Sequence, residues 1–142
     1  MAVLIAAGSA ATLAPTAVAG TAEQSRVVEL VNQARAKAGC GAVTTDARLT
    51  NAAQKHSADM ANRSYFDHTS PNGVTFAKRI TDAGYPSPGA ENIAMGQTSA
   101  DQVMDAWMKS AGHKANILNC SLKTIGVGVE PNGWYWTQDF GR

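Results

Sequence analysis

The sequence predicts an α+β fold in which helices pack against an antiparallel hairpin. Between residues 21 and 118, apolar side chains recur mainly at intervals of three and four, which is the period of one helix face. After residue 124 the period changes to two, because Ile125, Val127 and Val129 alternate with less apolar positions. A turn at 131–133 and an aromatic run at 134–140 complete the hairpin. Aromatic side chains of that run alternate between the faces of the strand, so helices are expected on both faces.

Residues that cap or break helices divide the first part of the chain. A serine or threonine followed three positions later by glutamine opens the first and fourth helices, and a glycine closes the first and third. The four expected helices span about 21–39, 45–64, 72–84 and 99–113, the last with a weak point or end at Gly112. In the hairpin, Gly126 and Gly128 share one face, which predicts close packing by a helix or by a bulky side chain such as Trp107.

Composition and charge indicate one globular domain. The 142 residues carry twelve Lys and Arg against eleven Asp and Glu, which gives a formal net charge of +1. This balance offers no field of one sign to a polyanion, so nucleic acid is not an expected partner. The sequence contains neither a repeat nor a linker that would divide residues 20–142, and a monomer is expected.

The N-terminal stretch has the composition of a secretory signal. Residues 1–20 are free of charge, and an apolar run leads to Ala17-Val18-Ala19, which predicts a signal peptide at 1–19 with cleavage after Ala19. The basic segment that normally precedes the apolar run is missing, so the true start of translation could lie further upstream, and a disordered Ala-rich tail is the alternative. We expect an extracellular protein whose mature chain has no membrane span, since the apolar run is too short for one.

Cys40 and Cys120 are the two cysteines, 80 residues apart. Neither lies in a spacing typical of zinc or redox sites, which favours one structural disulfide in an exported domain. Two buried free thiols are the alternative if the protein stays in the cytosol.

Three polar, turn-like segments carry the candidate chemistry, in His68, Glu91 and His113. Two imidazoles and a carboxylate could bind a zinc-like ion or act as an acid–base pair, although separations of 23 and 22 residues match no local metal motif. His56 lies on the apolar face of the second expected helix, so we predict a hydrogen-bonded core histidine there.

Four segments in order resemble the bacterial branch of the CAP superfamily, which groups cysteine-rich secretory proteins, antigen 5 and pathogenesis-related proteins. The segments are Phe-Asp-His-Thr-Ser-Pro at 66–71, Gly-Ala-Glu-Asn-Ile-Ala at 89–94, Trp-Met-Lys-Ser-Ala-Gly-His-Lys-Ala-Asn-Ile-Leu at 107–118 and Ile-Gly-Val-Gly-Val at 125–129. The resemblance covers about residues 24–142. It implies a secreted, three-layer α-β-α sandwich with a central cleft in which some members bind zinc or another divalent ion.

Carried over by motif, His68 and His113 resemble the family's paired histidines, and Glu91 resembles its signature glutamate with one residue inserted before it. Ser110 stands where eukaryotic members carry a second glutamate, and a hydroxyl cannot replace a carboxylate as base or counter-charge. Asn92 and Gln138 are expected to support the metal or ligand groups by hydrogen bonds, with a turn-capping amide as the alternative for Asn92.

Three function classes follow from this resemblance. The first is a secreted binding module whose cleft, with or without a divalent metal such as zinc, holds a lipid, a glycan or a protein. The second is a metal-dependent extracellular hydrolase acting on cell-wall or protein substrates, in which Glu91 would serve as the catalytic general base. The third is a scaffold with an empty cleft. The loss of a carboxylate at Ser110 favours binding over hydrolysis.

Overall fold

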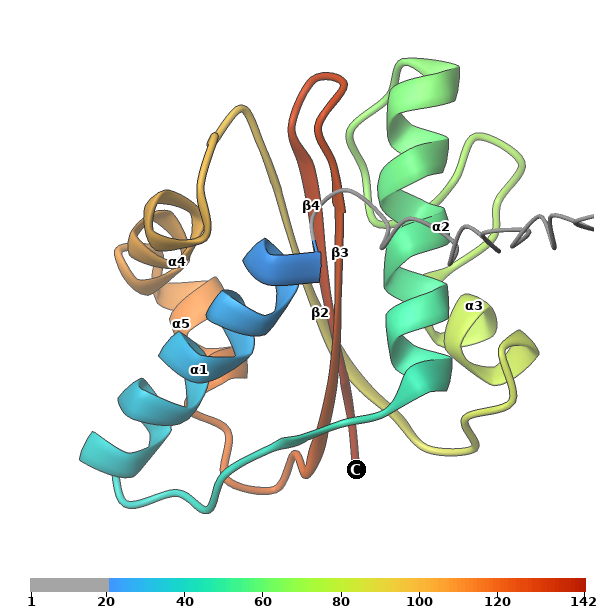
Figure 1. The fold of residues 1–142 in the computed structure, drawn as a ribbon. Coiled ribbons are helices and arrows are strands. Elements are labelled where there is room, and N and C mark those ends of the chain that lie inside the picture. The colour runs from blue at the N-terminus through green and yellow to red at the C-terminus, as the bar shows by residue number, and fades with distance from the viewer. Residues whose placement is uncertain (1–20) are drawn as a thin grey trace, which may run out of the picture.

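The computed structural model describes residues 21–142, so the predicted signal peptide and its cleavage site lie outside the described residues. Three layers form an α-β-α sandwich, as predicted (Figure 1): α2 and α3 cover one face of a sheet, and α1, α4 and α5 cover the other. The elements in chain order are α1 (Thr21–Lys37), β1 (Thr44–Thr45), α2 (Ala47–Arg63), α3 (Phe76–Asp82), β2 (Pro88–Met95), α4 (Ala100–Met108), α5 (Ala111–Ile117), β3 (Thr124–Glu130) and β4 (Tyr135–Gly141). Within this part of the chain, no helix combines the length and apolar content needed to cross a membrane.

The sheet has the strand order β1-β3-β4-β2. The predicted hairpin is confirmed, because β3 and β4 pair antiparallel with Gly126 opposite Asp139. β2 adds antiparallel to β4, whereas β1 pairs parallel with β3, so the sheet is mixed rather than purely antiparallel. The sequence analysis missed β2, since the Pro and Gly residues at 86–89 indicate turns and the buried polar pair Glu91-Asn92 breaks the apolar pattern of a strand.

The tightest contact between layers is that of α2 with β3. The Asp46 side chain accepts from the Arg48 backbone N–H and caps the start of α2. A Cβ atom at Gly126 or Gly128 would overlap the α2 backbone near Leu49 and Ala53, respectively. The prediction of close packing is therefore confirmed, and the packing partner is a helix rather than Trp107.

Two predicted local features are corrected. α3 begins at Phe76, capped by the hydroxyl of Thr75 rather than opened at residues 72–73. The fourth expected helix is two helices, and the chain breaks at Ser110, whose extended backbone starts α5, while Gly112 lies inside α5. Gln24 Nε2 donates to Val127 O at 2.8 Å and to Gln54 Oε1 at 3.0 Å and so joins the first turn of α1 to β3 and α2.

The disulfide Cys40–Cys120 is confirmed, with the two Cα atoms 5.0 Å apart. It joins the end of α1 to the loop between α5 and β3, and a buried arginine lies beside it. Arg35 is 1% exposed and donates hydrogen bonds to four backbone carbonyls of these same two segments. The apolar core fills the adjoining space between the sheet and the layer of α1, α4 and α5.

Candidate functional site

A cavity of about 510 Å³ opens along the outer edge of β2. Its walls come from the loop after α2, the start of α3, the first half of β2, and α5. The lining residues are His68, Thr69, Thr75, Phe76, Gly89, Ala90, Glu91 and Asn116. We call this cavity the cleft.

Glu91 is the buried centre of the cleft. Its side chain is 0% exposed, and His68 Nδ1 lies 2.9 Å from Oε1. The Arg79 guanidinium binds the same carboxylate on both oxygens, with Nη1 2.8 Å from Oε2 and Nη2 3.1 Å from Oε1. The bidentate pair holds the carboxylate in one orientation and balances its charge inside the protein.

Asp139 lies directly across from Glu91 in the strand register, and it is fully buried. Neither of its carboxyl oxygens has a donor among residues 21–142. Burial and the negative charge of Glu91 raise the pKa of Asp139 well above its usual range. A protonated Asp139 can donate a hydrogen bond to Glu91. The Asp139 proton and the Arg79 guanidinium then stabilise the two neighbouring carboxyl groups together.

The same neighbours set the ionisation of Glu91. Burial alone raises the pKa of this carboxyl, but hydrogen bonds from His68, Asp139 and Arg79 outweigh burial and lower its pKa below the ordinary value. The hydrogen bond to Glu91 in turn raises the pKa of His68, against the opposing effect of desolvation. A charged His68 beside an ionised Glu91 is the arrangement these shifts favour.

His113 approaches β2 from α5, the layer on the opposite face of the sheet. Its Nδ1 lies 2.8 Å from Ser110 Oγ. Burial, followed by the charge of His68, lowers the pKa of His113. The two histidines therefore differ: His68 has a carboxylate partner and His113 has a hydroxyl.

Asn92 and Gln138 fix the backbone beside His113. Asn92 is fully buried in β2, and its Nδ2 donates to His113 O at 3.1 Å and to Gln138 Oε1 at 3.0 Å. Asn116 Nδ2 donates to Asn92 Oδ1 at 2.8 Å and so ties α5 to the strand. Asn92 is thus part of a buried amide network rather than a turn cap.

His56 is the predicted core histidine, at 1% exposure. Its Nε2 donates to Asp67 O at 2.8 Å, since a carbonyl oxygen can only accept. The neutral ring holds the loop that carries His68, because burial lowers the pKa of His56.

The side chains around Glu91 do not favour it as a metal ligand. Across the described part of the chain, no group of three or more His, Cys, Asp or Glu side chains is placed to hold a metal ion. Both Glu91 oxygens already accept from Arg79, whose fixed positive charge would also repel a divalent cation. The two imidazoles remain the donors with which the zinc prediction has to be tested.

Sequence reasoning missed Arg79 and Asp139. Arg79 lies in a helix that the sequence predicts from its apolar positions. In such a helix, a charged residue is normally assigned to the face exposed to solvent. The position of Asp139 in the strand could have been used to find it. In the β3–β4 pairing, Asp139 and Thr137 stand across from Gly126 and Gly128, the two glycines that contact α2. A carboxylate on a face covered by a helix requires a partner.

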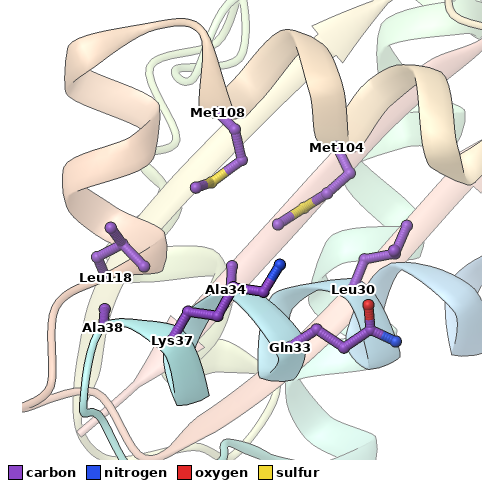
Figure 2. A pocket seen from close by; sticks show the side chains of 8 residues that line it. All are labelled: Leu30, Gln33, Ala34, Lys37, Ala38, Met104, Met108 and Leu118. Carbon is purple, nitrogen blue, oxygen red and sulfur yellow. The ribbon is translucent and has the colours of Figure 1, made fainter.

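A second hollow, of about 430 Å³, lies between α1 and α4 in the helical layer that also contains α5. Figure 2 shows Met104 and Met108 pointing from α4 toward α1, with Lys37 at its edge. Leu30, Ala34 and Leu118 complete its mainly apolar wall. We call this hollow the apolar groove.

Comparisons with known proteins agree with the fold. The model of the CAP family, described as the cysteine-rich secretory protein family, matches residues 28–140. The protein YkwD of Bacillus subtilis is 42% identical over 131 residues, which cover 91% of this chain and 50% of YkwD. The chain thus spans about half the length of this relative.

Two solved structures are similar in fold. An extracellular protein of Bacillus anthracis that contains an SCP domain has a TM-score of 0.80 at 29% identity, over 85% of this chain and 40% of that one. An outer surface protein of Borrelia burgdorferi has a TM-score of 0.79 at 21% identity, over 87% of this chain and 94% of that one. At 21% identity, the second likeness concerns the fold alone.

Proposed function

The chain belongs to the cysteine-rich secretory protein (CAP) family, and on that premise we propose that it is an extracellular binding module. Its cleft holds a neutral, hydroxyl-rich ligand of the glycan class without a metal ion. The charge-free segment at residues 1–20 and the extracellular description of the Bacillus anthracis relative support the location.

The internal charge balance of Glu91 carries this proposal. Glu91, the one carboxylate on the cleft lining, already accepts from both Arg79 and His68, so the cleft offers a ligand no free carboxylate and mainly hydrogen-bonding groups. Thr69, Thr75 and Asn116 line the cleft together with the aromatic ring of Phe76. Sugars match such a lining, because they combine many hydroxyls with apolar ring faces.

A neutral oligosaccharide, chitotetraose, tests the proposal by calorimetric titration. We expect Phe76→Ala to weaken binding by about tenfold, which is the usual effect of removing an aromatic contact of about 1.4 kcal/mol. Phe66→Ala is the matched control, since Phe66 is exposed and does not line the cleft. If EDTA abolishes binding, the proposal that no metal is needed is wrong. If Phe76→Ala and Phe66→Ala weaken binding equally, the ligand does not lie in the cleft.

The zinc prediction is decided by the same method. Titration of wild type, His68→Ala and His113→Ala with zinc measures whether the imidazoles hold an ion. If the cleft works without metal, the wild type shows no saturable zinc binding that needs both histidines. If the two histidines share a zinc site, the wild type binds zinc and either variant loses that binding.

Hydrolysis remains the alternative function, and the state of Glu91 argues against it. A general base needs a free oxygen and a pKa near the working pH. Both Glu91 oxygens accept hydrogen bonds, and the pKa of the carboxyl is lowered, so it is a weak base. Release of reducing ends from cell-wall glycan, lost in Glu91→Gln, would favour hydrolysis over binding.

The apolar groove favours a second candidate ligand, an acyl chain. Methionine and leucine side chains suit a flexible hydrocarbon, and the Lys37 ammonium at the edge suits its carboxylate. Titration with dodecanoate tests this candidate, and Met104→Asp should abolish binding if the chain lies in the groove.

A further inference from the structure

Two Asn-Gly pairs lie in turns of this molecule, at 72–73 and 132–133. In this dipeptide the glycine backbone nitrogen can attack the side-chain amide of the preceding asparagine, because glycine has no side chain to hinder the approach. Asn72 lies in the loop between α2 and α3, and Asn132 lies in the turn that joins β3 to β4 (Figure 1). Both asparagines and both glycines are exposed to solvent, so exposure does not distinguish the two pairs.

The first pair is held by its own turn. Gly73 N donates to Ser70 O at 2.8 Å, so Gly73 is the last of the four residues of a β-turn. The Asn72 side chain is fixed as well, because its Oδ1 accepts from Ser70 Oγ at 2.6 Å and lies 3.5 Å from Arg63 Nη2. Attack by Gly73 N on the Asn72 amide therefore requires that both hydrogen bonds with Ser70 break.

The second pair is shifted by one position in its turn. Trp134 N donates to Pro131 O at 3.2 Å, which places the Asn-Gly pair at the two central positions. The central N–H of such a turn takes no part in the turn hydrogen bond, and Gly133 N has no acceptor among residues 21–142. The Asn132 side chain makes no hydrogen bond in this part of the chain either, since only its backbone N donates, to Glu130 Oε1 at 3.1 Å. The attacking nitrogen and the amide are therefore both free in the folded protein.

We propose that Asn132 is a site of spontaneous deamidation in the folded protein, whereas Asn72 is protected. Gly133 N forms a bond to Asn132 Cγ, the bond from Cγ to Nδ2 breaks, and ammonia leaves with the proton of the Gly133 N–H. Water then opens the cyclic imide to aspartate or isoaspartate. The product carries one more negative charge, so the formal net charge falls from +1 to 0. The new carboxylate lies close to Glu130, which contacts the Asn132 backbone.

Peptide mapping of one sample measures both sites. Trypsin cleavage places Asn72 in the peptide 64–78 and Asn132 in the peptide 124–142, so mass spectrometry follows the two rates side by side. During incubation of the folded protein in neutral buffer, we expect Asn132 to deamidate about tenfold faster than Asn72, because Asn72 first has to break its hydrogen bonds. The result is independent of glycan binding, since residues 131–134 do not line the cleft.

Incubation in urea with the disulfide reduced is the control. Without the folded turns, both Asn-Gly pairs should react at similar rates, so the difference between them should disappear. Ser70→Ala removes the hydrogen bond to the Asn72 side chain and should raise the rate at Asn72 alone. Equal rates at the two sites in the folded wild type, or a difference that persists in urea, would overturn the proposal.

Discussion

Two arginines, the buried Arg35 and the partly buried Arg79, satisfy buried acceptors in different ways. Arg35, beside the disulfide, meets only backbone oxygens at 2.8 to 3.0 Å and has no carboxylate partner in the described chain. Arg79, beside the cleft, meets the buried carboxylate of Glu91. Arg35 therefore satisfies carbonyls that would otherwise be orphaned, whereas Arg79 balances a charge. The first role is structural and insensitive to the ionisation of neighbours, and the second ties the site to pH.

Replacing Arg35 should give the largest effect. Arg35→Met leaves the carbonyls of Gly41, Ile117 and Leu122 without the guanidinium donor, two of them buried, and we expect a loss of about 3–5 kcal/mol in the free energy of unfolding. Urea denaturation with the disulfide intact measures it. Arg35→Lys should recover part of the loss, because an ammonium retains three donors. A loss below about 1 kcal/mol would mean that water replaces the guanidinium.

Replacing Arg79 should have a smaller and pH-dependent effect. Arg79→Met leaves Glu91 buried without its cation, which costs about 2–4 kcal/mol at neutral pH. Because the folded pKa of Glu91 is lowered, its contribution to stability is present above the unfolded pKa and is lost as pH falls through the folded pKa. The difference between variant and wild type should therefore shrink toward acid pH in denaturation curves.

A double variant checks the cause. Glu91→Gln in the Arg79→Met background removes the unpaired charge and should restore part of the stability at neutral pH. A double variant that is no more stable than Arg79→Met would show that packing, not charge, explains the loss.

The smallest effect concerns the two histidines His68 and His113, of which only His68 contacts Glu91. The hydrogen bond to Glu91 raises the pKa of His68, and burial followed by the charge of His68 lowers that of His113, so their NMR titration midpoints should fall on opposite sides of about 6.5. The stability that His68 contributes is full below its unfolded pKa and is lost as pH rises through the folded pKa. Glu91→Gln should lower the His68 midpoint. Coincident midpoints in the wild type would contradict the assigned hydrogen bond.

The local sequence determined most of the helices, the β3–β4 hairpin and the pairing of the two cysteines. The helices and the hairpin follow from local patterns, namely the apolar period, the capping residues and the turn residues. The disulfide follows because the chain has two cysteines, Cys40 and Cys120, which allow a single bridge. The close approach of a helix to Gly126 and Gly128 was also readable, since alternate glycines have little other use in a strand.

Only the tertiary structure decided what surrounds Glu91. The partners of this residue come from a loop, a helix and a neighbouring strand, and no local pattern specifies that His68, Arg79 and Asp139 meet there. The break at Ser110 belongs to the same class, because its helix turns to place His113 against Asn92 rather than to satisfy a local propensity. A buried charge needs a partner close by, and the packing of the three layers determines which residues lie close enough to be that partner.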